Sequence, residues 1–412
     1  MELTSTTKAG RRFVEIAEEH IEAFRARANT HDRDGSFPTE NFDELRKSGA
    51  VGAFAPKELG GLGLDSIHDW ATGIERLARG DASTAIALNM HLGISRTLAQ
   101  SLRSARSRGD ADSIARNEGM MSAIAAGELL ICATATEPGT DFLRPRTQAT
   151  RIDEGWSISG RKVFVTMSPV ANLYALNVRA ADPDDQGATD RMGFAFLPVG
   201  TPGITPQDDW DALGMRASGS QSIVLEDCRV PEGSVQLLGN WGEWNAGLLM
   251  GRTLGNITLT GAFLGIAERA RELAIEGAKR NSKPKYDGAV ANASGVQHLL
   301  GEIDIDLAAA RAVLNDATAG IDALLEQDEA PDLETAHGCM RDYQCAKWTV
   351  NQNAISIVSK AMDVCGGGAF MSGNELSRLY RDVRAGPFMQ PFSPTEAREY
   401  VGQIALGMPP RG

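Results

Sequence analysis

The polar residues whose spacing best suits chemistry lie in the run Ile131–Phe142, ICATATEPGTDF. An apolar stretch there gives way to Thr134 and Thr136, a carboxylate, a Pro-Gly pair and a second hydroxyl-carboxylate pair. Proline fixes φ and glycine accepts positive φ, so Pro138-Gly139 forces a turn. N–H groups and hydroxyls before a forced turn form a concave donor surface, which suits the polar edge of a ring or a phosphate. Taken alone, the run is more typical of a strand end closed by Asx and Ser/Thr hydrogen bonds, so its function depends on its surroundings.

A second candidate is His91, in the polar insert Asn89-Met90-His91 of the mostly apolar segment Asp81–Leu102. A helix this apolar is expected to be buried. A single histidine in such a helix is more often a hydrogen-bonded core residue than a catalytic one. The five cysteines contain no CxxC pair and do not cluster with the six histidines, so we expect no metal site.

Composition narrows the class of protein. A chain of 412 residues suits two or three domains, and 42% hydrophobic with 23% charged residues is typical of a globular protein. The net charge of −13 argues against a nucleic-acid partner and against an anionic membrane surface. Scattered cysteines, a polar start and the lack of a long apolar run indicate a cytoplasmic protein with no membrane partner.

The periodicity of the hydrophobic residues changes twice along the chain. Helical spacing over residues 1–130 predicts an N-terminal all-α domain. Short alternating segments over 131–235 predict a β domain, a small barrel or sandwich, with a hairpin tip at Asp182–Gly187. Helical spacing then returns over 236–412 and predicts a C-terminal four-helix bundle. Its helices are expected at Asn245–Lys279, Ala291–Glu326, Leu333–Val364 and Ser393–Leu406. The fold class is therefore α+β, mainly α.

Several stretches, taken in this order, resemble the acyl-CoA dehydrogenase family. The motifs that carry the resemblance are Pro56–Gly63, Thr136–Asp141, Gly160–Thr166, Leu213–Ser220, Val224–Pro231 and Cys365–Asp382. They cover nearly the whole chain, and their agreement in order outweighs the low specificity of each.

The resemblance implies FAD between the β domain and the bundle. Main-chain groups around Ala135 and Thr136 would face the isoalloxazine edge, and Thr140 would lie near the pyrophosphate or the ligand's thioester end. Phe164 would lie against the ring, and the Thr166 hydroxyl would lie near flavin N5. Donors placed at the ring edge raise the electron affinity of a flavin.

The resemblance also implies a homotetramer or homodimer in which a partner subunit contributes to the adenosine end of FAD. Gly366, Gly367 and Gln297 match positions of that region. The family's Phe-Gly after the helix arginine is missing, because Arg280 is followed by Asn-Ser-Lys-Pro.

For the substrate, the resemblance implies an acyl-CoA or similar thioester. Arg252 and Asn256 would lie on the helix face that meets the ligand head, although the same spacing suits a buried polar pair. An electron-acceptor flavoprotein would then be the redox partner.

The catalytic base departs from the family. Oxidation of an acyl-CoA needs a carboxylate to take the α-proton. The family's glutamate falls at Gln390, and its alternative falls at about Gly255, so neither position holds a carboxylate. Two hypotheses follow.

The leading hypothesis is an FAD-dependent oxidoreductase acting on the CH–CH group of an acyl thioester, with a base such as Glu396 or Glu399. The alternative resembles the monooxygenases built on this fold, which use FMN reduced by a partner flavin reductase; His91 matches a histidine of that subgroup. A third class, a flavin-free scaffold, is disfavoured because Thr136 and Thr166 are retained.

Overall fold

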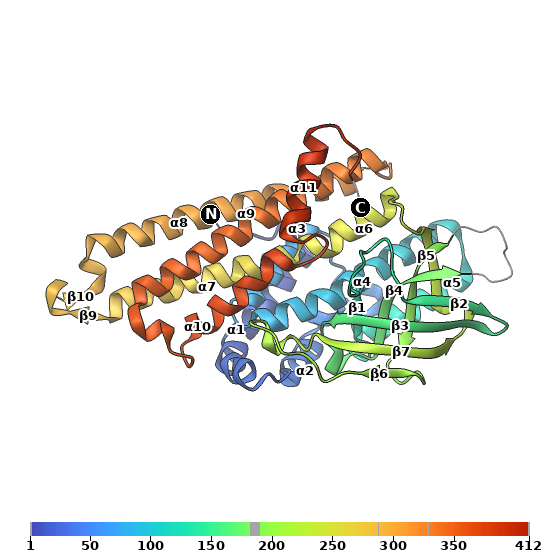
Figure 1. The fold of residues 1–412 in the computed structure, drawn as a ribbon, viewed down its shortest axis with the longest axis horizontal. Coiled ribbons are helices and arrows are strands. Elements are labelled where there is room, and N and C mark those ends of the chain that lie inside the picture. The colour runs from blue at the N-terminus through green and yellow to red at the C-terminus, as the bar shows by residue number, and fades with distance from the viewer. Residues whose placement is uncertain (1, 182–189, 287, 328, 411–412) are drawn as a thin grey trace.

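The computed structural model describes residues 2–181, 190–286, 288–327 and 329–410 (Figure 1). The expected tip at Asp182–Gly187 lies outside these residues. Helices occupy both ends of the chain and a β sheet occupies its middle, so the mainly helical α+β class is confirmed.

Five helices form the N-terminal part. They are α1 (Lys8–Asp34), α2 (Thr39–Ser48), α3 (Ile67–Ala78), α4 (Ala82–Arg108) and α5 (Ala111–Ala125). The first begins where the hydroxyl of Thr7 accepts a hydrogen bond from Gly10 N, and it ends at Gly35 in the left-handed conformation. Every residue of α3 is buried, which makes this helix the centre of the N-terminal core.

Eight strands form one sheet. They are β1 (Ile131–Thr134), β2 (Gln148–Ile152), β3 (Gly155–Val165), β4 (Leu173–Ala181), β5 (Arg191–Pro198), β6 (Ile204–Pro206), β7 (Gln221–Val230) and β8 (Val235–Asn240). Their order is β6-β7-β3-β2-β4-β5-β8, with β1 beside β4. Both β1 and β2 run parallel to β4, and the other neighbours are antiparallel. The sequence pattern fits either a small barrel or a sandwich. In the described residues β6 and β8 are the two edge strands of the sheet, and they do not pair with each other.

The C-terminal part is again helical. Its elements are α6 (Ala246–Ile257), α7 (Leu259–Arg280), a short hairpin of β9 (Ser282–Lys283) and β10 (Gly288–Ala289), α8 (Ser294–Leu325), α9 (Leu333–Cys365), α10 (Glu375–Asp382) and α11 (Pro394–Ala405). The long helices α7, α8 and α9 lie side by side (Figure 1). The prediction of one helix over Asn245–Lys279 is wrong, because the chain turns at Thr258 between α6 and α7. The Thr258 hydroxyl donates to Asn89 Oδ1 of α4 at 2.8 Å, so a contact with the N-terminal part accompanies the break.

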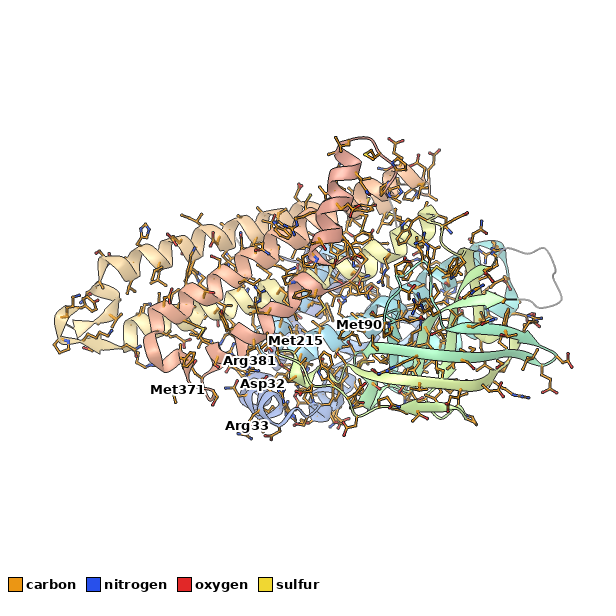
Figure 2. The ribbon with its side chains drawn as sticks, viewed as in Figure 1. Asp32, Arg33, Met90, Met215, Met371 and Arg381 are labelled. Atoms are coloured by element: carbon orange, nitrogen blue, oxygen red, sulfur yellow. The ribbon has the colours of Figure 1, made fainter. Side chains whose placement is uncertain are left out.

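A polar junction joins all three parts of the chain. Arg381 of α10 lies beside Asp32 at the end of α1 (Figure 2), with Nη1 2.8 Å from Oδ1. The next residue, Asp382, accepts a hydrogen bond from Met215 N of the β6–β7 connection at 2.6 Å. The segment after α10 is thereby directed back toward the sheet. Among the described helices none is long and apolar enough to cross a bilayer.

His91 joins the N-terminal helices to the sheet. It is completely buried in α4; its Nε2 lies 3.0 Å from Val51 O, and its Nδ1 accepts from Ile131 N at 3.0 Å. These partners assign the neutral tautomer with the proton on Nε2. Burial lowers the pKa of His91 to about 4, so the ring stays neutral near pH 7.

This neutral histidine should make the protein less stable in acid. Between an unfolded pKa of about 6.5 and the folded value, the unfolded chain binds more protons, so stability falls as pH falls. The His91→Gln variant has no histidine to titrate at this position. The difference in free energy of unfolding between wild type and His91→Gln should therefore be about 2 kcal/mol smaller at about pH 5 than at about pH 7.5. Chemical denaturation at both pH values measures the difference, with His298→Gln on the exposed face of α8 as control. A deficit independent of pH would show that folded His91 titrates normally and would return it to the candidates for catalysis.

A buried ion pair fixes the turn after β1 to the sheet. Lys162 of β3 is completely buried, and its Nζ lies 2.5 Å from Glu137 Oε1 and 2.6 Å from both Asn177 O and Asn177 Oδ1. Glu137 also accepts from the N–H groups of Arg146 at 2.6 Å and Thr147 at 3.1 Å. Burial lowers the pKa of Lys162 to about 8 despite the carboxylate. Burial alone would raise the pKa of Glu137, but Lys162 and Thr147 hold it below its ordinary value.

Removing the cation of this buried pair should lower the free energy of unfolding far more than removing the cation of an exposed pair. Lys162→Met leaves a buried carboxylate without its cation, so the free energy of unfolding should fall by about 3–5 kcal/mol. Urea denaturation measures it. The double variant Lys162→Met/Glu137→Gln should recover much of the loss, and Arg103→Met, which breaks an exposed pair with Asp65, should cost less than about 1 kcal/mol. Equal effects of Lys162→Met and Arg103→Met would contradict this role.

Candidate active site

The turn after β1 forms one wall of a cavity of about 420 Å³. Its other wall comes from the segment before α11 and from α11 itself. The lining residues are Ala135, Thr136, Glu137, Thr140, Asp141, Phe142, Leu143, Trp244, Phe388, Gln390, Pro391, Phe392, Ser393, Glu396, Glu399, Tyr400 and Gln403. The volume is that of a small-molecule site. The fold thus places four of the predicted site residues, Ala135, Thr136, Thr140 and Gln390, around one space.

Gln390 reaches across this space to the turn. Its side-chain Nε2 donates a hydrogen bond to Thr136 Oγ1. Thr140 uses its own hydroxyl within the turn, where it donates to Arg144 O at 2.5 Å. The Gln390–Thr136 contact therefore places the family's base position directly opposite the first motif.

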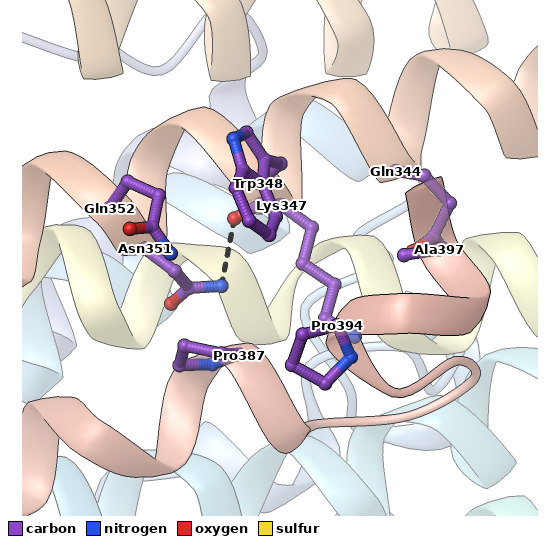
Figure 3. A pocket seen from close by; sticks show the side chains of 8 residues that line it. All are labelled: Gln344, Lys347, Trp348, Asn351, Gln352, Pro387, Pro394 and Ala397. Atoms are coloured by element: carbon purple, nitrogen blue, oxygen red, sulfur yellow. Dashed lines mark hydrogen bonds between the residues drawn. The ribbon is translucent and has the colours of Figure 1, made fainter. Parts of the chain in front are cut away.

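Buried donors of α9 hold the Gln390 segment by its backbone. Tyr343 Oη donates to Gln390 O at 2.7 Å, and Lys347 Nζ donates to Met389 O and, at 2.7 Å, to Phe392 O. Figure 3 shows Lys347 extending from α9 to the side of Pro394. Burial, with a smaller contribution from Arg252, lowers the pKa of Lys347 to about 7. The three donated bonds restrain the main chain on both sides of the Gln390 side chain.

Tyr343 and Lys347 were not among the residues predicted from the sequence. They are four residues apart on the buried face of α9. A lysine is almost never fully buried unless its ammonium group has a partner. Position in the helix could have singled out Lys347, but its partners are backbone carbonyls more than forty residues away, which no side-chain pattern reveals.

Phe164 of β3 and Thr166, which follows this strand, are the residues predicted to lie against a flavin, and neither lines the cavity. A single bridge pairs Thr136 with Val163, and Val163 N donates to Thr136 O at 3.0 Å, so Phe164 is a close neighbour of the turn. Phe164 has a φ of 54° and is 56% exposed, with its ring edge-on to Trp210 at 5.9 Å. The Thr166 hydroxyl is bonded to Ser220 Oγ at 2.8 Å. A large exposed ring at positive φ is an unusual conformation that a stacked ligand would explain.

The α6 residues predicted to meet the substrate differ in environment. Asn256 is buried and donates from Nδ2 to Arg252 O within the helix at 2.7 Å. Arg252 lies against Phe142 of the cavity wall, with Cζ 4.3 Å from the ring centroid. Gly255, the alternative base position, has open space where a side chain would extend.

Both carboxylates proposed as substitute bases line the cavity. Glu396 accepts from Ser393 N at 2.8 Å and so caps α11, while Glu399 accepts from Gln403 Nε2 at 3.1 Å. His91, in contrast, lies behind β1 and is not part of the wall.

The residues predicted to meet the adenosine end lie elsewhere in the chain. Gln297 starts α8, and Gly366 and Gly367 follow α9, at the end of the bundle that points away from the sheet (Figure 1). Gln297 donates to Ala291 O at 3.0 Å, and Gly366 has a φ of 75°. One chain does not bring them to the cavity. No cluster of three or more His, Cys, Asp or Glu suited to a metal occurs in the part of the chain that the structure describes.

Comparison with known proteins agrees with this architecture. Three acyl-CoA dehydrogenase domain models match in order: the N-terminal domain over residues 7–101, the middle domain over 131–228 and the C-terminal domain over 249–390. L-evernosamine nitrososynthase from a Micromonospora species is 37% identical over 98% of this chain and 91% of its own. Amino sugar nitrososynthase DnmZ from Streptomyces peucetius is 34% identical over 97% and 94%.

A solved structure gives the same result. KijD3 in complex with FMN and dTDP-3-amino-2,3,6-trideoxy-4-keto-3-methyl-D-glucose superimposes with a TM-score of 0.90 at 35% identity, covering 99% of this chain and 96% of that one. The resemblance inferred from the motifs is thereby confirmed: this chain belongs to the acyl-CoA dehydrogenase family.

Proposed function

We propose that this chain is a flavin-dependent nitrososynthase-type oxygenase that oxidises the amino group of a nucleotide-linked amino sugar. The observation that carries the proposal is Gln390, whose amide is fixed opposite Thr136 where the family's dehydrogenases need a carboxylate. An amide cannot take the α-proton of an acyl thioester. Two relatives that are 34% and 37% identical over nearly the whole chain are named as nitrososynthases, one of amino sugars and one of L-evernosamine, which supports the same order of preference.

The residues around the cavity fit a flavin. The exposed face of Phe164 supplies a flat apolar surface, and main-chain groups at Ala135 and Thr136 supply polar groups for the ring edge. Thr166, two residues after Phe164, has a hydroxyl bonded to Ser220 and is the residue expected near flavin N5. When bound in reduced form, a flavin activates molecular oxygen for transfer to the substrate. A partner flavin reductase is the expected source of reducing equivalents.

FMN is the form of flavin that one chain accommodates by itself. Gln297, Gly366 and Gly367, matched to the adenosine end of FAD, lie at the far end of the bundle (Figure 1). FAD would need these residues from a second subunit, whereas FMN needs no adenosine contact. KijD3 has been crystallised with FMN, which supports this assignment.

The polar wall suits an amine. Glu396 and Glu399 line the cavity from α11 and favour the approach of a cationic group. The amide of Gln390 and the hydroxyl of Thr136 can then orient the substrate by hydrogen bonds. Neither side chain competes as a strong base for a carbon-bound proton.

A second candidate is dehydrogenation of an acyl thioester, the leading hypothesis from the sequence. It is kept because Glu396 and Glu399 do reach the cavity. It ranks second because Glu396 is engaged in capping α11 and Gln390 occupies the position opposite the turn.

Two assays on the purified protein separate the candidates. With a flavin reductase, FMN, oxygen and amino sugar nucleotides, we expect N-oxidised products by mass spectrometry. The same protein loaded with flavin should keep its yellow colour when mixed anaerobically with acyl-CoA thioesters. Anaerobic bleaching together with an absence of N-oxidised product would replace the proposal with the dehydrogenase.

The Gln390→Glu variant tests the position opposite the turn. A carboxylate cannot donate to Thr136 and adds charge beside the substrate, so the rate of N-oxidation should fall at least about tenfold. Gln352→Glu, an equal change of charge on the exposed face of α9, is the matched control and should keep the wild-type rate. Equal rates for Gln390→Glu and Gln352→Glu would remove Gln390 from the site.

A further inference from the structure

Arg252 carries an unused pair of hydrogen-bond donors. Its Nε and Nη2 are buried and have no hydrogen-bond partner among the described residues, and no described carboxylate acts on its pKa. Nε–H and Nη2–H form one edge of the guanidinium, with two parallel donors. That edge matches two oxygens of a phosphate or carboxylate.

The guanidinium lies directly behind an aromatic part of the cavity wall. Its Cζ is 4.3 Å from the centroid of Phe142, which stacks on Trp244 at 5.7 Å. Both rings line the cavity, and the Arg252 side chain as a whole is partly exposed rather than sealed in the core. Arg252 itself does not line the cavity, so a ligand meets the unused edge only if it extends past the rim that these rings form.

The second cation of this region strengthens the local positive field. Lys347 is buried, has no carboxylate within ion-pair distance among the described residues, and donates to the carbonyls of Met389 and Phe392. The nearby Tyr343 is neutral and donates to Gln390 O. Two neighbouring cations without a carboxylate, the buried Lys347 and the half-buried Arg252, stand out in a chain of net charge −13. Buried charges are normally paired, so this arrangement indicates a missing anion.

We propose that Arg252 binds a phosphate of the substrate, in the diphosphate that joins the nucleoside to the sugar. The identity of the anion rests on the proposed function, because the sugar nucleotide brings two phosphates to the same cavity. The bidentate edge of Arg252 then holds the diphosphate behind Phe142, while the amino sugar extends toward Gln390 and Thr136. Arg252 thus contributes to substrate binding rather than to the chemical step. The carboxylates of α11 face the amino sugar part of the ligand.

Titration calorimetry with thymidine diphosphate, thymidine and inorganic pyrophosphate tests this site. Thymidine diphosphate should bind wild type more tightly than thymidine. Arg252→Gln should raise the Kd for the diphosphate at least about tenfold and leave the Kd for thymidine unchanged, since one charged bidentate contact is lost. Arg252→Lys, which keeps the charge but not the fork, should fall between.

The matched control is Arg398→Gln. Arg398 also lies over an aromatic ring, with Cζ 4.7 Å from the centroid of Trp348, but it does not line the cavity. The Arg398→Gln variant should bind all three compounds with the Kd values of wild type. Equal Kd values for thymidine diphosphate in wild type and Arg252→Gln would overturn the proposal. Should Arg252→Gln fail to fold, pyrophosphate must still displace thymidine diphosphate from wild type, and a failure to compete would overturn it as well.

The site and the reaction fail independently. Binding of thymidine diphosphate through Arg252 without any N-oxidised product would reject the proposed function and leave the phosphate site intact. N-oxidation by Arg252→Gln with the KM of wild type would reject the phosphate site and leave the function intact. A raised KM with an unchanged kcat supports a residue that binds substrate rather than one that orders the fold.

Discussion

The buried pair of Lys162 and Glu137 is the constraint on which the site depends. The turn that follows β1 has no regular hydrogen-bond ladder, so its shape comes from the carboxylate of Glu137, which accepts from two backbone N–H groups and one ammonium. Lys162 in turn spans to Asn177 of β4 and thereby fixes the turn to the middle of the sheet. A buried ion pair is a poor source of net stability, but breaking it leaves a buried charge unpaired, so the pair holds the turn in one arrangement. That single arrangement presents Thr136 to the cavity.

The opposite wall is built on a different principle. The segment around Gln390 is itself neither strand nor helix. Its carbonyls accept hydrogen bonds from a hydroxyl and an ammonium group of α9. The two walls are therefore set by separate elements and meet at the Gln390–Thr136 hydrogen bond. On the proposed function, the reaction can change through a single side chain on the second wall, because the first wall, proposed to meet the cofactor, remains as it is.

The sequence predicted what depends on local pattern. The helices α8 and α9 lie within about three residues of their expected bounds because their apolar stripes and breaker residues are local signals. The break at Thr258 was missed because the accompanying bond to Asn89 comes from α4. His91 matches a histidine of the monooxygenase subgroup, yet both ring nitrogens contact backbone groups that sequence spacing does not bring near it. Lys347 was missed for the same reason, since its partners are carbonyls of a distant segment.

The separation of the two ends of the bundle relates the form of the flavin to the need for a second subunit. Thr136 and Phe164 lie at the sheet, whereas Gly366 and Gln297 lie at the other end of the long helices (Figure 1). A cofactor that contacts both sets must bridge two chains, so an FAD enzyme on this fold requires an oligomer for a complete site. A cofactor that ends at its first phosphate has no such requirement. On the proposal that the flavin is FMN, the exposed ring of Phe164 and the cavity beside Thr136 would supply its contacts within one chain, and the site would not depend on a second subunit.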